Sequence, residues 1–141
     1  MKDYNPGVQL TEHFWSGEFQ CQCGCGFGLA PGDMDMEVVE GLEKMRVITG
    51  QPIYVVRFNP ATGDFGQAGS GCRCEARNRA IGGVEGSFHT QGRAADTWGQ
   101  PVAHLLKAAQ QVPAFAEGGI GRYERRMFVH VDNGPRRRWR G

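Results

Sequence analysis

The sequence contains no long hydrophobic run. Its 141 residues include no stretch of 18 or more apolar residues, whereas a membrane-spanning helix needs about 20. The first residues, MKDYNP, also lack an apolar segment of the signal-peptide type. We therefore expect a protein without a membrane partner, made in the cytosol and leaving it only by release or by another export route.

An excess of positive charge is also missing. The chain has 16 Lys and Arg residues against 15 Asp and Glu, which gives a net charge of +1. A protein that binds nucleic acid through a global positive field needs a larger excess. We therefore expect no nucleic-acid partner.

Neither a repeat, a low-complexity tract nor a domain boundary interrupts the chain, and its length suits one domain. We expect a single domain over residues 1–141 that begins with an irregular arm over residues 1–32. Glycine, in contrast, is abundant, with 22 residues, about twice the usual ~7%. Because these glycines follow no collagen period, they indicate many turns, short elements and long loops.

Hydrophobic periodicity predicts the main elements. Apolar residues at i, i+3 and i+4 predict a helix that is capped by Asp35 and ends at Gly50. Further helices are predicted over residues 75–81 and from Pro101 to before Pro113, and strands over residues 52–56, 94–97 and 127–132 and near Trp139. Without regular βαβ alternation, these elements predict an α+β fold, with a small, largely antiparallel sheet flanked by a few helices.

Two histidines and one aspartate stand in a pattern typical of a metal site. The segment from Ser87 to Asp96 has the form S-x-H-x-x-G-x-A-x-D, and FVHVD follows some thirty residues later. His89, Asp96 and His130 form a mixed nitrogen and oxygen set that suits Zn²⁺ and leaves a fourth position for water, which the metal would activate. A histidine without such neighbours, such as His13 or His104, is more often structural.

With these residues in this order, the sequence resembles the M15 family of zinc D,D-peptidases, whose fold also occurs in the hedgehog signalling domain. It is most similar to the short branch found in bacteria and in phage lysis proteins, and the resemblance extends from about His13 to Trp139. The segments that carry it, besides the two above, are HF followed by EFxC, SGCR followed by Asn78, GG at 82–83, GIGxY at 119–123, and Arg138-Trp139.

The resemblance implies a fold like that of hedgehog and the D,D-peptidases, and zinc held by His89, Asp96 and His130. Arg73 would bind a carboxylate or carbonyl of the substrate, although it could also be an ordinary loop arginine. The implied activity is hydrolysis of an amide bond in peptidoglycan peptides, as a D,D-carboxypeptidase or endopeptidase, including the phage endolysins. We expect a monomer that acts on the cell wall after its release. The alternative is a zinc-containing binding module without catalytic activity.

The general base is the least defined part of the expected site. Many M15 enzymes carry an acid three positions before the last histidine ligand, where this chain has Met127. Asp132 is the first candidate because residues 130 and 132 of a strand point to the same face. It could take a proton or orient a ligand. Glu124 is the second candidate, with a surface charge as its alternative. The missing acid also keeps the non-catalytic alternative open.

The five cysteines form two groups, Cys21, Cys23 and Cys25 in one and Cys72 and Cys74 in the other. An odd number disfavours a complete disulfide framework. Because both groups resemble segments of the phage-like branch, we expect them to face each other. Four thiolates could hold a second, structural Zn²⁺; two disulfides with one spare thiol, or free cysteines, are the alternatives. No arrangement of a cysteine with a histidine indicates a catalytic thiol.

Overall fold

The structure is a computed structural model that describes residues 4–59, 61–65 and 70–141. Within these ranges no helix combines the length and the hydrophobicity needed to cross a membrane. The elements, in chain order, are η1 (Ser16–Phe19), α1 (Met36–Thr49), β1 (Phe58–Asn59), β2 (Asp64–Phe65), α2 (Glu75–Ala80), η2 (Phe88–Gln91), β3 (Ala94–Thr97), α3 (Val102–Gln110), α4 (Pro113–Ala116), β4 (Gly119–Tyr123), β5 (Phe128–Asp132) and β6 (Arg137–Arg140), where η denotes a 3-10 helix.

Four strands form the main sheet, in the order β3-β5-β4-β6. The β3–β5 and β5–β4 pairs are antiparallel, and β6 joins β4 in parallel. Strands β1 and β2 form a separate two-stranded sheet. The predicted α+β fold with a largely antiparallel sheet is therefore confirmed.

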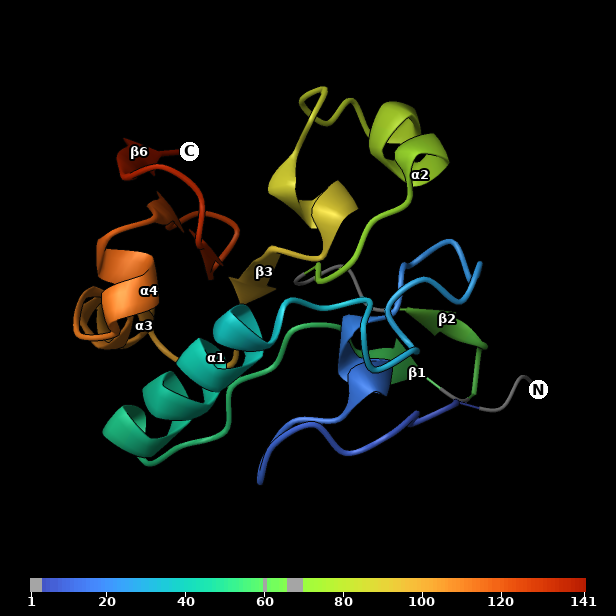
Figure 1. The fold of residues 1–141 in the computed structure, drawn as a ribbon, viewed down its shortest axis with the longest axis horizontal. Coiled ribbons are helices and arrows are strands. Elements are labelled where there is room, and N and C mark those ends of the chain that lie inside the picture. Colours follow the sequence, from blue (N-terminus) through green and yellow to red (C-terminus); the bar gives the residue numbers. More distant parts are fainter. Residues whose placement is uncertain (1–3, 60, 66–69) are drawn as a thin grey trace.

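The two faces of the main sheet have different surroundings. Ala95, Ile120, Val129 and Val131 are buried in the hydrophobic core. Helix α3 packs against β4, β5 and α1, and α4 packs against α1, α3 and β4 (Figure 1). Because successive residues of a strand point to opposite faces, Asp96 and His130 lie on the other face, away from these helices. One face thus serves the core and the other is available for a site.

Helix α1 has the ends that its sequence predicts. The carboxylate of Asp35 accepts a hydrogen bond from the backbone N–H of Glu37 at 2.9 Å, and Gly50 ends the helix in the left-handed conformation with φ 66°. In the middle of the helix, Gly41 faces the ring of Phe115 from α4. A Cβ at this position would lie 2.7 Å from that ring, so the absence of a side chain permits the two helices to approach closely.

The N-terminal segment is part of the core. Phe14 and Phe19 are almost fully buried; Phe14 precedes η1, and Phe19 is its last residue. The carbonyl of Phe19 accepts a hydrogen bond from the backbone N–H of Cys72 at 2.9 Å, and that of Glu18 accepts one from Val56 at 3.1 Å. Residues 14–19, within the arm predicted over residues 1–32, thus connect the core to the segment around Cys72.

One strand assignment from the sequence is wrong, and one strand of the main sheet is missed. Residues 52–56 form no strand, since Tyr54 makes only an isolated bridge to Trp98. The branched residues here are buried in the core, and burial alone gives a segment the composition of a strand. Conversely, the sequence does not predict β4, because the glycines in GIGRY weaken the strand pattern.

Glu18 has a carboxyl group whose pKa is shifted by burial. Its side chain accepts the backbone N–H of Trp15 at 2.8 Å. Burial raises the pKa of Glu18 to about 7; the Trp15 hydrogen bond opposes this shift, and the nearby Glu43 adds to it. The folded state therefore holds this proton more tightly than the unfolded state. The resulting stabilisation is present at low pH and is lost as the pH rises through about 7.

We predict that Glu18→Gln increases the stability at pH 8 by up to about 3 kcal/mol, because it removes a buried charge and keeps an acceptor for Trp15. Near pH 4.5 the variant and the wild type should be nearly equal. Chemical denaturation at both pH values measures the difference. Glu12→Gln removes an exposed charge of the same segment and serves as the control. A stability difference that does not change with pH would contradict the prediction.

Candidate metal centre

Strand register places two of the predicted ligands side by side. Asp96 of β3 is the direct antiparallel partner of His130 of β5, so both side chains project from the same face. His130 Nδ1 lies 3.0 Å from Asp96 Oδ1. The backbone N–H of Asp96 also binds the carbonyl of Ser70 at 2.8 Å, which holds the segment before Arg73 against this edge of the sheet.

The third predicted ligand comes from a loop. His89 lies on η2, which Ser87 caps by accepting the backbone N–H of His89 at 3.3 Å and which Gly92 ends in the left-handed conformation. His89 Nε2 lies 3.3 Å from the same Asp96 oxygen. The candidate donor atoms of His89, Asp96 and His130 all lie within 4.8 Å of one another. The structure thus brings the three predicted ligands together.

Hydrogen bonds behind the imidazoles fix which nitrogen of each ring is free. His89 Nδ1 lies 2.8 Å from the carbonyl oxygen of Gly71, and His130 Nε2 lies 2.7 Å from a carboxylate oxygen of Asp132. Both partners accept, so these two nitrogens carry the hydrogens. When each ring is neutral, the nitrogens with a lone pair are then His89 Nε2 and His130 Nδ1, the two that lie next to Asp96. This arrangement fits a divalent metal ion such as Zn²⁺, whose histidine ligands donate their other N–H to such acceptors.

The charges of the cluster also favour a cation. Burial would raise the pKa of Asp96, but the two imidazoles hold it well below its usual range. Burial would lower the pKa of His130, but the hydrogen bonds to Asp132 and Asp96 outweigh it and raise this pKa to about 9. Without a metal, His130 therefore stays protonated. The proton on Nδ1, which faces Asp96, occupies the position that a metal ion could take.

Asp132 is fully buried behind His130. In addition to His130, it accepts hydrogen bonds from Arg137 Nη2 at 2.8 Å and from the backbone N–H groups of Gly119 at 3.0 Å and Gly134 at 2.9 Å. A Cβ at Gly119 would lie 2.4 Å from the carboxylate, so a side chain there would displace it. Burial raises the pKa of Asp132, but these donors lower it overall. Asp132 is thus a charged carboxylate whose oxygens are fully occupied by hydrogen bonds.

An aromatic side chain reaches the centre across a glycine. Gly121 of β4 pairs with His130 on one side and with Trp139 of β6 on the other. A Cβ at Gly121 would lie 2.3 Å from the indole, so the ring occupies the space that a side chain would take. The rings of Trp139 and His130 are 5.0 Å apart between centroids. Trp139 also donates its indole N–H to the hydroxyl of Tyr123 at 2.7 Å.

The three predicted ligands line a cleft of about 760 Å³. Arg73 lines it, as predicted for a group that contacts substrate, and its guanidinium donates to Asn78 Oδ1 at 2.9 Å. Arg77, Arg126 and Arg137 line it as well. Among the described residues, Asp96 and Asp132 are the carboxylates of this lining, so the rest of the cleft is predominantly positive.

The remaining acidic candidate lies elsewhere. Glu124 is about half exposed, forms an ion pair with Arg122 at 2.5 Å and does not line the cleft. Met127, at the position of the missing acid, is exposed. His13 pairs with Glu43 at 2.6 Å, and His104 is exposed on α3. Both lie outside the cluster, as the sequence predicts.

Sequence reasoning missed Gly71, Asn78 and Arg137 as supports of the centre. Asn78 and Gly71 belong to the SGCR and Asn78 match, but nothing in that match indicates a carbonyl behind His89. Arg137 lies in a run of arginines that indicates only a basic surface.

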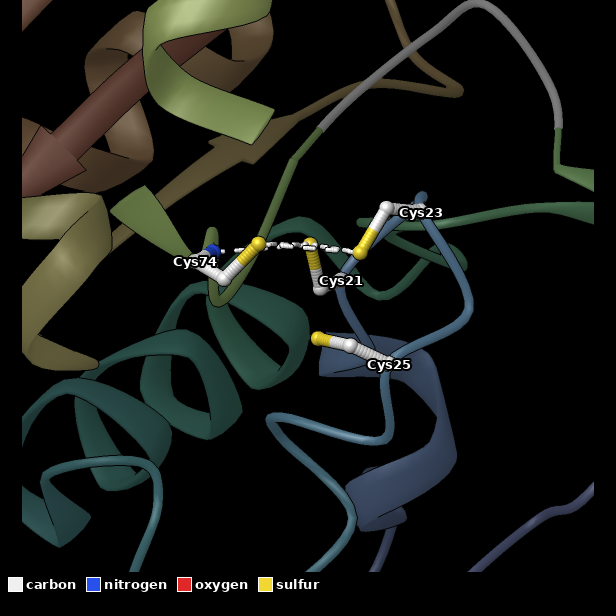
Figure 2. Close-up of side chains that lie close together, drawn as sticks. All are labelled: Cys21, Cys23, Cys25 and Cys74. Carbon is white, nitrogen blue, oxygen red and sulfur yellow. Dashed lines mark hydrogen bonds between the residues drawn. The ribbon is translucent and has the colours of Figure 1, made fainter. Parts of the chain in front are cut away.

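Four of the five cysteines form a second cluster. Cys21, Cys23, Cys25 and Cys74 offer sulfur atoms that lie within 4.8 Å of one another (Figure 2). Cys72 is buried elsewhere, with its sulfur 3.8 Å from the carbonyl of Asp33. The two predicted groups of cysteines thus face each other through Cys74 alone.

Comparison with known proteins identifies the family. The profile described as Peptidase M15 matches residues 12–132, which includes the whole metal cluster. The chain belongs to the peptidase M15 family.

Curated M15 relatives match a shorter stretch. The peptidoglycan L,D-endopeptidase MepK of Escherichia coli K12 is 42% identical over 67 residues, which cover 46% of this chain and 35% of the relative. The probable peptidoglycan L,D-endopeptidase MepK of Haemophilus influenzae is 35% identical over 65 residues, which cover 46% and 34%. The M15 chain thus spans about a third of the length of the curated relatives it matches.

We predict that His89→Ala removes one equivalent of bound zinc per chain, because it removes one of the three predicted ligands of the cluster. His104→Ala, which alters an exposed histidine, should leave the zinc content unchanged. Elemental analysis after dialysis against trace zinc measures both variants. Equal zinc contents in the wild type and His89→Ala would show that His89 is not a ligand.

Proposed function

We propose that this chain is a zinc-dependent peptidase that hydrolyses an amide bond in peptidoglycan peptides. One observation carries the proposal: His89, Asp96 and His130 converge in a cleft, with candidate donor atoms within 4.8 Å of one another and an acceptor behind the other nitrogen of each imidazole. Membership of the M15 family and the names of the matched relatives support the substrate class.

Three protein ligands are the usual number in a catalytic zinc site, whereas structural sites have four. When bound, zinc would supply Lewis acidity, which polarises an amide carbonyl and activates water. The residues of the chain would hold and orient the participants. His89, Asp96 and His130 would bind the ion, and Trp139 and Phe128 would form apolar parts of the wall beside it.

Arg73 would position the substrate. Its guanidinium is partly buried and held by Asn78 and, more weakly, by Ser70, with Nη2 3.4 Å from Ser70 Oγ. A fixed guanidinium can form paired hydrogen bonds with a carboxylate or bind a carbonyl. Peptidoglycan peptides carry free carboxylates, so the positive lining of the cleft supports this substrate class. The alternative, a binding module without catalysis, would need the same cleft and the same charge.

Within this activity we favour an endopeptidase, because both named relatives are L,D-endopeptidases. We predict that the zinc-loaded protein cleaves purified peptidoglycan and releases new amino and carboxyl ends. Mass spectrometry of the muropeptides before and after digestion identifies the bond. A chelator should stop the release, and His89→Ala should be inactive. Binding to peptidoglycan without any new ends would favour the non-catalytic alternative.

Asp132, the first candidate for the general base, is better suited to positioning His130. A base works best when its pKa is near the working pH. Burial raises the pKa of Asp132, but His130, Gly134 and Arg137 lower it overall. Its contact with His130 Nε2 keeps Nδ1 free to bind the metal. We therefore infer that Asp132 acts through His130, which is the second of the two roles that its sequence position suggests.

Asp132→Asn should weaken zinc affinity by ~10–100-fold, the usual cost of losing a partner behind a ligand. The rate at saturating zinc should fall much less. Competition with a chromophoric chelator and rates at high zinc, measured on the same samples, separate the two effects. Glu124→Gln should change neither, because Glu124 is exposed and paired with Arg122. Full zinc affinity with a kcat lowered by at least ~10²-fold would instead identify Asp132 as the base.

A further inference from the structure

The four clustered cysteines come from two distant parts of the chain. Cys21, Cys23 and Cys25 belong to a loop near the N-terminus, and Cys74 directly precedes α2. The sulfur of Cys21 lies 3.4 Å from that of Cys23 and 3.7 Å from that of Cys74, and Cys23 and Cys74 are 3.6 Å apart. Figure 2 shows the sulfurs of Cys21, Cys23 and Cys74 connected by dashed lines, with the sulfur of Cys25 beside them.

We propose that Cys21, Cys23, Cys25 and Cys74 bind a structural Zn²⁺, separate from the catalytic centre. Zn–S bonds are about 2.3 Å long, so the sulfurs of a tetrahedral site lie about 3.8 Å apart. The three distances above are close to this value, and the fourth sulfur lies within 4.8 Å of the others. A cluster of several iron atoms would hold its sulfurs farther apart.

Disulfides fit this arrangement less well. A disulfide joins two sulfurs at about 2.05 Å and separates them from the other pair. Here Cys21, Cys23 and Cys74 lie at nearly equal distances from one another, so no pair is singled out. Equal spacing among sulfurs is what a single central ion requires.

Backbone N–H groups support sulfur acceptors at the same place. The N–H of Cys74 lies 3.4 Å from the sulfur of Cys21, and the N–H of Arg77 lies 3.4 Å from that of Cys74. Gly24 and Gly26 have φ values of 82° and 92°, which other residues adopt only at a cost. These turns allow three alternate cysteines of a short loop to converge.

The cluster would hold the catalytic loop in place. It connects the N-terminal segment to residues 71–74, where the Gly71 carbonyl binds His89 and Arg73 lines the cleft. The neighbouring hydrogen bond from Cys72 to Phe19 runs between the same two segments. A metal ion at the cluster would therefore fix the distance between the core and one wall of the cleft.

Zinc content tests the proposal. The wild type should bind two zinc ions per chain. The double variant Cys23→Ser/Cys25→Ser, which alters two exposed residues, should lose one of them. Cys72→Ser changes the cysteine that lies outside the cluster and should keep both. His89→Ala should keep the cysteine-bound ion, so failure of the catalytic site and failure of this site give different results.

Cobalt provides a second, independent measurement. Co²⁺ bound to four thiolates gives an intense sulfur-to-metal charge-transfer band, which His89→Ala should retain and Cys23→Ser/Cys25→Ser should lose. In the zinc-loaded wild type, four cysteines should react slowly with a thiol reagent until a chelator is added. Two zinc ions remaining in the double variant would overturn the proposal. So would intramolecular disulfides among these four cysteines in the native, metal-exposed protein.

Discussion

The pairing of Asp96 with His130 across β3 and β5 is the constraint on which the rest of the site depends. It places a carboxylate and an imidazole on the same face of the sheet, in one row with Gly121 and Trp139. A shift of the register by one residue would turn His130 into the core and expose Val129 or Val131. Burial of these two valines therefore secures the position of the ligand on the opposite face.

The space needed beside His130 explains why two positions of β4 are glycine. Gly121 leaves room for the Trp139 indole beside His130, and Gly119 leaves room for the Asp132 carboxylate. Asp132 is buried and charged, an arrangement that would be costly without partners. Its four donors satisfy it, and it in turn fixes His130. Two layers of contacts behind His130 thus hold Nε2 and turn Nδ1 toward Asp96.

The parts of the site that depend on residue type could be predicted from the sequence, and those that depend on backbone could not. The motif predicted the cluster of His89, Asp96 and His130, which the structure brings together, because metal binding needs these side chains. Apolar periodicity predicted α1, and the residue types of Asp35 and Gly50 predicted its two ends. Gly71 supplies His89 with a carbonyl, which every residue has, so this role leaves no signal in the sequence; its lack of a side chain instead serves the close approach to Phe19, whose Cα would lie 2.7 Å from a Cβ there. Strand β4 was missed for a related reason, since its glycines serve the neighbours of the strand. Residues 52–56 show the opposite case, because a strand is predicted where none forms. Their branched side chains are buried in the core, and this burial, without strand pairing, explains the composition.

The centre is assembled from two structural units with different stability. Asp96, His130 and Asp132 belong to the sheet, whose register is set by the core beneath it. His89 and Arg73 belong to loops outside the sheet, and Gly71 joins them to it by the hydrogen bond to His89 and the adjacent Ser70–Asp96 bridge. Loops of this kind are the less stable parts of a protein, yet ligand geometry tolerates little displacement. The loop side therefore needs anchors of its own, and Asn78, the Phe19–Cys72 hydrogen bond and the cysteine cluster all lie where such anchors are needed.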